Sequence, residues 1–168
     1  MAHPVPDAFN LTLVGETADI NAGQLIDRVG VMMGLDFPCG AALEVLAREG
    51  SFEKQRVKSV VRSDDGMIRC NLSGIENIAK RMLDEGKEKS DVAAYVFASV
   101  CDTLSRMAEA AIEKYGEMPV LFSGGVMSNR LMRDKLSARF DASFAEPQFS
   151  ADNAAGIALL CRNKFIKK

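Results

Sequence analysis

The stretch VLFSGGVMSNRLMRDKL (Val120–Leu136) decides the fold that this sequence predicts. It opens with a β-branched and apolar run, and Ser123-Gly124-Gly125 follows. Apolar residues then recur at helical spacing as far as Leu136. This order predicts a strand, a tight glycine turn and a helix.

The glycine turn also predicts a ligand site. Adjacent glycines let the backbone approach a ligand closely and adopt positive φ. A helix that starts there directs its free N–H groups and its positive dipole end to the same place. An anion or a nucleotide is the expected occupant. The alternative is that the two glycines serve only the packing of strand against helix, as in many such turns.

The rest of the chain supplies further predicted elements. Asp65-Gly66 lies between two strand-like runs and predicts a hairpin. Ser73 with Glu76 has the spacing of a capping box at a helix start. The predicted strands are Phe9–Val14, Val57–Arg62, Met67–Leu72, Val120–Phe122 and Ala142–Ala145, and the predicted helices are Thr17–Met33, Ala41–Arg48, Ser73–Leu83, Asp91–Tyr115, Val126–Leu136 and one that begins at Ala154. Strands that alternate with helices after a hairpin predict an α/β fold, with the last two strands as neighbours.

Composition narrows the class of protein. The chain has 168 residues, of which 48% are hydrophobic and 26% charged, as in a globular domain. The net charge of −2 gives no sign of a nucleic-acid partner. No apolar run reaches membrane length, so no membrane partner is expected. The proline-rich residues 1–8 are expected to form a disordered leader, and residues 9–168 one lobe with a helical insertion.

Cysteine and histidine usage excludes some chemistries. The four cysteines, at positions 39, 70, 101 and 161, form no CxxC pair and have small or apolar neighbours. Buried, reduced thiols and a cytoplasmic location are expected. The only histidine is His3, so this chain alone cannot build a histidine-rich metal site or a Ser-His-Asp triad.

Four blocks of the sequence match one family in the right order. They are GETADINAGQLIDRVGVMMGLDFPCG (Gly15–Gly40), NLSGIEN (Asn71–Asn77), LFSGGVMSNRLMRDKL (Leu121–Leu136) and FAEPQFSADNAAGIALL (Phe144–Leu160). Together they resemble the tRNA threonylcarbamoyladenosine transferases, a family with the older name of O-sialoglycoprotein endopeptidases or glycoproteases. The resemblance implies the actin-like ATPase fold of sugar kinases and heat-shock chaperones. It covers only the later portion of the family's length, and so implies the C-terminal lobe, without the His-x-x-x-His metal pair and Ser-Gly-Gly-His loop of the earlier lobe.

The resemblance also implies roles for individual residues. Those implied to contact a nucleotide or carbamoyl-adenylate are Asp27, Gly40, Glu44, Gly124, Gly125 and Asn129. Ionised carboxylates accept hydrogen bonds from ribose hydroxyls, and an amide both donates and accepts. Asp152 matches the aspartate that completes the metal site. Ser150 is expected to cap the last helix and so to fix this carboxylate as a hard ligand.

The sequence departs from the family pattern in three places. Where the family has a pair of aspartates at a helix start, this chain has Asp19 followed by Ile20 and Asn21. The glutamate that follows in the family is replaced by Gln24. A family lysine is replaced by Glu76, and a family threonine by Ala151. These changes suggest a divergent paralogue.

Plain structural roles are open for the same residues. Asp27 could instead be a surface carboxylate paired with Arg28 or Arg48. Asp152 could be a carboxylate at a helix start, where the helix dipole favours it. Asn129 could be a solvated residue in the first turn of a helix.

The leading hypothesis is a lobe that, in the intact protein, binds an adenine nucleotide (ATP or threonylcarbamoyl-adenylate) and a divalent metal (Fe or Zn). Neither is expected to bind tightly to this chain alone, which should not catalyse. The expected partners are the missing N-terminal lobe, a homologous actin-like subunit and tRNA, whose adenosine N6 would be the acceptor. A second hypothesis is a degenerate paralogue that acts as a scaffold. A metalloendopeptidase, the third, follows from the older family name alone, because the chain has no HExxH motif.

Overall fold

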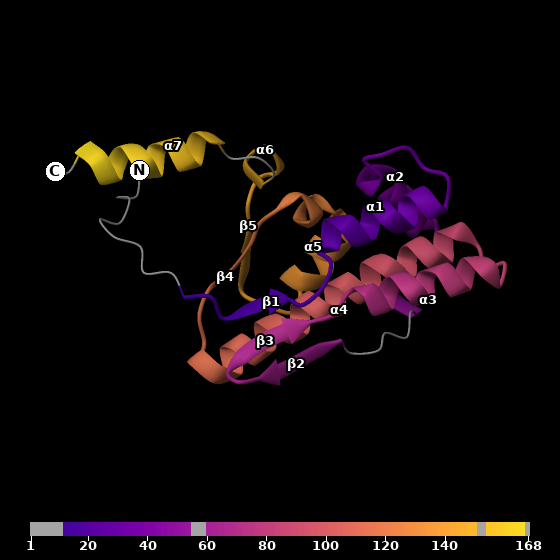
Figure 1. Ribbon diagram of the computed structural model, residues 1–168, viewed down its shortest axis with the longest axis horizontal. Coiled ribbons are helices and arrows are strands. Elements are labelled where there is room, and N and C mark those ends of the chain that lie inside the picture. The colour runs from indigo at the N-terminus through magenta and orange to yellow at the C-terminus, as the bar shows by residue number, and fades with distance from the viewer. Residues whose placement is uncertain (1–11, 55–59, 151–153, 167–168) are drawn as a thin grey trace.

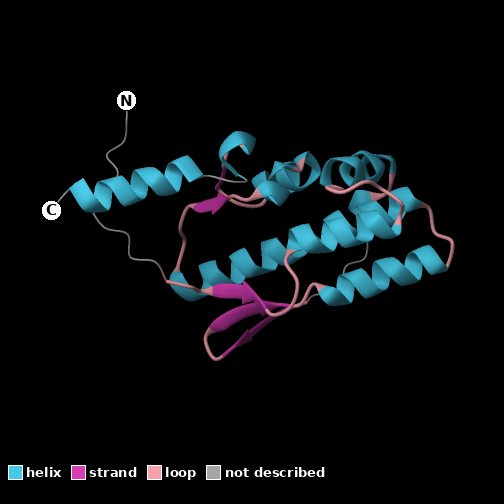
Figure 2. Ribbon diagram, turned by 45° about the horizontal axis from the view of Figure 1, so that its top comes forward, coloured by secondary structure: helices cyan, strands magenta, loops and turns pink. Residues whose placement is uncertain are grey.

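The structure, a computed structural model, describes residues 12–54, 60–150 and 154–166. The predicted leader (residues 1–8), the first half of one predicted strand (57–59) and Asp152 lie outside these ranges. The long helix α4 (Lys89–Tyr115) runs through the middle of the molecule, and several of the other elements pack against it (Figures 1 and 2).

Helix α4 forms the centre of the hydrophobic core. Its first half is buried on all sides, from Val92 to Cys101, because α1, α2 and α3 contact it from different directions. The helix ends at Gly116, whose φ of 87° is accessible mainly to glycine. At its other end, the Lys89 ammonium donates to the carbonyl of Met33 at 2.7 Å, so this lysine caps α1.

A three-stranded sheet covers one side of α4. Strands β1 (Gly15–Thr17), β3 (Met67–Cys70) and β2 (Val61–Asp64) lie in the order β1-β3-β2, with β1 parallel and β2 antiparallel to β3. The predicted hairpin is confirmed, because Asp65 and Gly66 both have positive φ, as its turn requires. The predicted strand Phe9–Val14 is wrong in its described part: the strand begins at Gly15, where the prediction ended it.

A second, parallel pair of strands follows α4. Strand β4 (Val120–Phe122) pairs with β5 (Ala142–Phe144) in the register Val120↔Ala142. The prediction of two neighbouring strands, each followed by a helix, is confirmed. With one mixed sheet and one parallel pair among its helices, the described chain has the predicted α/β architecture.

One predicted helix start and one predicted helix cap are wrong. Helix α1 (Ala22–Met32) begins five residues later than predicted, because Asn21 and Gln24 form a reciprocal capping box at 2.8 and 3.1 Å. Ser73 is the first residue of α3 (Ser73–Asp84) and not its cap. The carboxylate of Asp19 instead accepts the N–H groups of Leu72 and Ser73 at 2.8 and 3.0 Å, so the predicted capping box is not formed.

The remaining helices complete the structure. Helix α2 (Gly40–Glu49) matches its prediction to within one residue at each end, and a short 3-10 turn, η1 (Phe52–Lys54), follows it. The predicted helix after the glycine turn is interrupted: a 3-10 turn, η2 (Gly125–Ser128), precedes α5 (Arg130–Ser137). The last two helices are α6 (Pro147–Ser150) and α7 (Ala154–Ile166).

Helix α7 lies to one side of the other elements (Figure 1) and exposes apolar side chains, namely Ile157, Leu159, Leu160 and Phe165. None of the helices in the described part of the chain is both long and apolar enough to span a membrane. Three of the four cysteines are buried as expected, but Cys161, on α7, is exposed.

Candidate functional site

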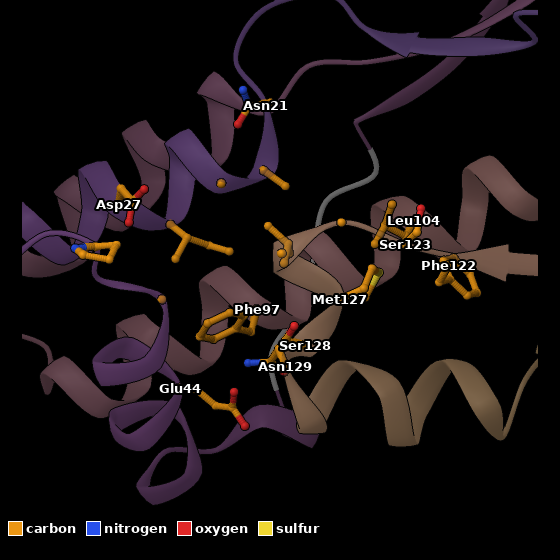
Figure 3. Close-up of a pocket in the computed structure, with 18 of the residues that line it drawn as sticks. Asn21, Asp27, Glu44, Phe97, Leu104, Phe122, Ser123, Met127, Ser128 and Asn129 are labelled. Carbon is orange, nitrogen blue, oxygen red and sulfur yellow. The ribbon is translucent and has the colours of Figure 1, made fainter. Parts of the chain in front are cut away.

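A pocket of about 880 Å³ lies where α1, α2, α4 and the glycine turn meet (Figure 3). This volume is within the usual range for small-molecule sites. All six residues predicted to contact a nucleotide line it: Asp27, Gly40, Glu44, Gly124, Gly125 and Asn129. The structure therefore brings together residues from three separate segments, and their role in binding stays a prediction.

The glycine turn forms one wall of the pocket. Gly124 has a φ of 106°, a conformation that side-chain-bearing residues rarely adopt. A Cβ added at Gly125 would meet no atom within 4 Å, so this residue faces open space. Glycine at these two positions keeps the wall free of side chains.

The N–H groups at the start of α5 are not open to a ligand. The N–H of Arg130 donates to the Glu44 carboxylate at 3.2 Å, and that of Met132 donates to the Asn129 side chain at 2.9 Å. Protein groups therefore occupy these two N–H groups, whereas those of Gly125 and Val126, where the predicted helix began, have no hydrogen bond among the described residues.

Asn129 connects the pocket to α5. Its side-chain oxygen caps that helix, and the residue is only 5% exposed, so it is not a solvated first-turn residue. Its amide nitrogen Nδ2 is buried and has no hydrogen-bond partner among the described residues. In Figure 3 this nitrogen points toward the side of the pocket that Glu44 and Phe97 line. A buried donor without an acceptor is unfavourable, and a ligand oxygen or ring nitrogen would relieve this cost.

Asp27 forms a hydrogen bond with the residue that precedes α2. Its carboxylate accepts the N–H of Cys39 at 2.8 Å. Arg28 and Arg48, the two expected partners in the structural alternative, pair with Glu76 and Glu44 instead. Burial, together with the carboxylates of Asp27 and Asp36, raises the pKa of the Cys39 thiol, so this cysteine stays protonated and is a poor nucleophile.

Glu44 connects α2 to the glycine turn. One carboxylate oxygen contacts both the Arg48 guanidinium, at 2.5 Å, and the N–H of Arg130, at 3.2 Å. The side chain is 16% exposed, so water competes weakly for it. This carboxylate is therefore held at the pocket wall from two sides.

Gly40 and apolar side chains shape the rest of the pocket. A Cβ added at Gly40 would touch only the Ile26 side chain, at 4.0 Å, and would otherwise occupy the pocket. Phe97, Leu104 and Met127 supply apolar surface. An apolar interior with a few polar groups at its edges suits a ligand that has both a flat ring and hydroxyl groups.

The sequence-based prediction missed Asn21 and Phe97 among the lining residues, and Ser150 beside them. Asn21 lines the pocket as the cap of α1, and the spacing of Asn21 and Gln24 is a signal that could have revealed it. Phe97 contributes to the pocket from the middle of α4, and its helical spacing alone marks only a core residue. Ser150 bonds to Gly124 rather than capping the last helix, and no sequence signal predicts that contact.

The described residues do not provide a complete metal site. Within residues 12–54, 60–150 and 154–166, no three His, Cys, Asp or Glu side chains are placed to hold an ion. Asp152, the one predicted ligand, lies outside these ranges, so its role stays a prediction.

The sequence model of the TsaD family, described as tRNA N6-adenosine threonylcarbamoyltransferase, matches residues 5–159. The chain belongs to this family. This confirms the family expected from the four sequence blocks, and two of these blocks supply five of the six pocket residues.

Individual family members are similar to the chain over almost its whole length. The tRNA N6-adenosine threonylcarbamoyltransferase of Streptococcus suis (strain 05ZYH33) is 28% identical, with 98% of this chain and 51% of that protein covered. The enzyme of Neorickettsia sennetsu is 32% identical, with 87% and 47% covered. That of Streptococcus sanguinis (strain SK36) is 29% identical, with 92% and 48% covered. The chain spans about half the length of these curated relatives.

Proposed function

We propose that this chain forms the nucleotide-facing half of a tRNA N6-adenosine threonylcarbamoyltransferase, as the C-terminal lobe of an actin-like fold. The observation that carries the proposal is the pocket, where six positions implied by the family resemblance meet around one buried, unpaired donor, the Asn129 amide. The proposed ligand is an adenine nucleotide or threonylcarbamoyl-adenylate.

Each polar residue has a distinct proposed task. The Asn129 amide donates to an acceptor on the sugar or base. Glu44 and Asp27 accept from ribose hydroxyls while their existing hydrogen bonds hold them in place. Gly40 and Gly125 leave room for the ligand to lie against the backbone.

The other half of the assembly completes the proposed enzyme. We propose Asp152 as this chain's single ligand to a divalent Fe or Zn ion, with the other ligands on the half that the chain does not cover. A bound ion of this kind polarises a carbamoyl group. The proposed acceptor is the N6 amine of a tRNA adenosine in the cytoplasm. The chain alone should not catalyse the transfer.

A titration of the isotope-labelled chain with ADP tests the proposal. We expect chemical-shift changes at the Asn129 side-chain NH₂ and the Gly125 amide. The affinity should be weaker than 1 μM, which corresponds to about −8 kcal/mol, because half of the cleft is absent. Pyrophosphate alone is the control, since the proposed contacts are to ribose and base. Shifts that are the same with pyrophosphate, or none at millimolar ADP, would contradict the proposal.

A non-catalytic scaffold is the second candidate, and one contact favours it. The surviving carboxylate of the paired-aspartate motif, Asp19, caps α3 and does not line the pocket. The α1 start that does line the pocket carries the neutral pair Asn21 and Gln24. Expression of the chain with its other half in cells that lack the housekeeping enzyme distinguishes the two candidates, since only a catalytic assembly restores the tRNA modification.

A further inference from the structure

We infer that Ser150 is a positioning residue for the pocket: its hydroxyl holds the glycine turn in the conformation that the ligand meets. This inference rests on the proposed function, because the turn matters only if the pocket binds a ligand. Ser150 itself does not line the pocket, unlike the six residues predicted to contact a nucleotide.

The contact is a two-way clamp on one residue. The N–H of Gly124 donates to the Ser150 hydroxyl oxygen at 2.8 Å, and the same hydroxyl donates to the carbonyl of Gly124 at 2.9 Å. A hydroxyl can do both because it carries one donor and two acceptor sites. Ser150 is 5% exposed, so water competes little for these bonds. The clamp joins α6 to a turn 26 residues earlier in the chain.

The glycine turn needs such a restraint. Gly124 has φ 106° and ψ 154°, and glycine has the widest choice of alternative conformations of any residue. Within the turn itself, the only bond to Gly124 is from the N–H of Met127 to its carbonyl, at 2.9 Å. Its N–H has no partner in the described chain except Ser150. Loss of the hydroxyl would therefore leave this N–H unpaired and the turn less restrained.

The clamp also decides which backbone donors remain for a ligand. The Gly124 N–H is occupied by Ser150. The next two N–H groups, of Gly125 and Val126, have no hydrogen bond in the described part of the chain, and both residues line the pocket. The Gly124 carbonyl and the Gly125 N–H belong to one peptide group, so Ser150 fixes the orientation of the first of these two donors.

The test compares four variants of the whole chain. Ser150→Ala removes the hydroxyl, Ser150→Thr keeps it, and Ser150→Cys keeps the size with a weaker hydrogen-bonding group. Ser143→Ala removes an exposed hydroxyl on β5 with no bond among the described residues and is the matched control. The first measurement is amide hydrogen exchange at Gly124 without ligand. We expect protection in the wild type, in Ser150→Thr and in Ser143→Ala, and exchange at least about tenfold faster in Ser150→Ala.

The second measurement is the dissociation constant for ADP, well below each variant's unfolding temperature. We expect about tenfold weaker binding in Ser150→Ala, which corresponds to about 1.4 kcal/mol, and wild-type binding in Ser150→Thr. A role confined to stability would lower the unfolding temperature and leave the affinity of the folded protein unchanged.

The outcomes separate the inference from the proposed function. Equal protection of Gly124 in the wild type and Ser150→Ala would overturn the clamp. Lost protection with unchanged ADP affinity would overturn the positioning role while the proposed function stands. Absence of ADP binding by the wild type would overturn the proposed function, and the positioning role with it. If Ser150→Ala does not fold, the ADP affinity of Ser150→Cys decides. We expect Ser150→Cys to bind ADP more weakly than Ser150→Thr does. An affinity equal to that of the wild type would overturn the positioning role.

Discussion

The carboxylate of Asp27 and the backbone N–H of Cys39 are joined by a hydrogen bond of 2.8 Å, which connects α1 to the turn before α2. Asp27 therefore has a structural role in addition to its proposed role toward a ligand. The two roles can be separated because Cys39 uses one carboxylate oxygen, and an asparagine has only one acceptor oxygen where the aspartate has two.

Asp27→Asn keeps an oxygen that can accept from Cys39 but removes the negative charge, whereas Asp27→Ala removes both. We expect Asp27→Ala to lower the free energy of unfolding by about 1 kcal/mol and Asp27→Asn to change it little. Both should weaken ADP binding. Urea denaturation and the ADP titration measure the two effects, and an Asp27→Asn protein with full ADP affinity would show that the charge is not used.

Gly40 and Gly30 form a matched pair for testing the pocket. A Cβ at Gly40 would point into the pocket with only Ile26 nearby, whereas one at Gly30 would collide with the Cys39 side chain. We expect Gly40→Ala to leave stability unchanged or raised by up to about 1 kcal/mol, since alanine favours a helix. Gly30→Ala should cost about 1–3 kcal/mol through overpacking.

ADP binding completes this comparison. Gly40→Ala should weaken it although the protein is stable, because the added methyl group occupies ligand space. Undiminished ADP affinity in Gly40→Ala would place the ligand elsewhere in the molecule.

Asp19 should make stability depend on pH. Burial raises the pKa of its carboxyl, but hydrogen bonds from Ser73, Leu72 and Ile20 lower it more, so the pKa is well below its usual value. A carboxyl whose pKa is lowered by folding contributes stability above its unfolded pKa, about 3.9, and loses this contribution as the pH falls toward the folded value.

The corresponding variant is Asp19→Ala. At pH 7 it should be less stable than the wild type by about 1 kcal/mol, the usual effect of losing a helix cap. The difference should persist down to about pH 5 and shrink below about pH 4. Urea denaturation at pH 7, 5 and 3 measures it, and a difference that grows as the pH falls would show the opposite linkage.

The sequence predicted those elements that local patterns decide. The Asp65-Gly66 hairpin and the neighbouring strands β4 and β5 needed only short-range information. The cap of α3 was predicted wrongly because Asp19, more than fifty residues earlier in the chain, supplies the cap that Ser73 was expected to provide. Such a tertiary bond has no local signature.

The site was predictable only through the family resemblance. Spacing alone suggested an anion at the start of a helix after Gly125. The structure interrupts that helix, and the N–H groups where α5 begins, of Arg130 and Met132, bond to Glu44 and Asn129. The six matched positions nevertheless meet in one pocket. The clamp between Ser150 and Gly124 depends on the packing of α6 against the turn, which neither periodicity nor resemblance revealed.

Asp152 leads to a prediction about metal content. One protein carboxylate is too few ligands for a tight transition-metal site, so the purified chain should carry well below one ion per molecule. Joined to the half that supplies the other ligands, it should carry Fe or Zn, and Asp152→Asn should reduce the metal content while leaving the fold intact. Elemental analysis and circular dichroism measure the two properties. Metal content unaffected by Asp152→Asn in the joined protein would favour the scaffold candidate.

Asn129 gives the most direct test of the pocket, because its two side-chain atoms have different tasks. The oxygen caps α5 through Met132, and the nitrogen is the buried donor without a partner. Asn129→Asp and Asn129→Ser both keep an oxygen that can cap the helix, and both remove the amide nitrogen. Asn129→Ala removes both groups.

We expect Asn129→Ser to fold with stability within about 1 kcal/mol of the wild type, since serine is a good cap and the unpaired donor is gone. Asn129→Ala should be less stable than Asn129→Ser by about 1 kcal/mol. ADP binding should be weakened at least about tenfold in all three variants, and most in Asn129→Asp, whose charge lies near Glu44 and would repel a phosphate. If Asn129→Ser binds ADP as the wild type does, the buried nitrogen is not a ligand donor, and Asn129 serves only to cap α5.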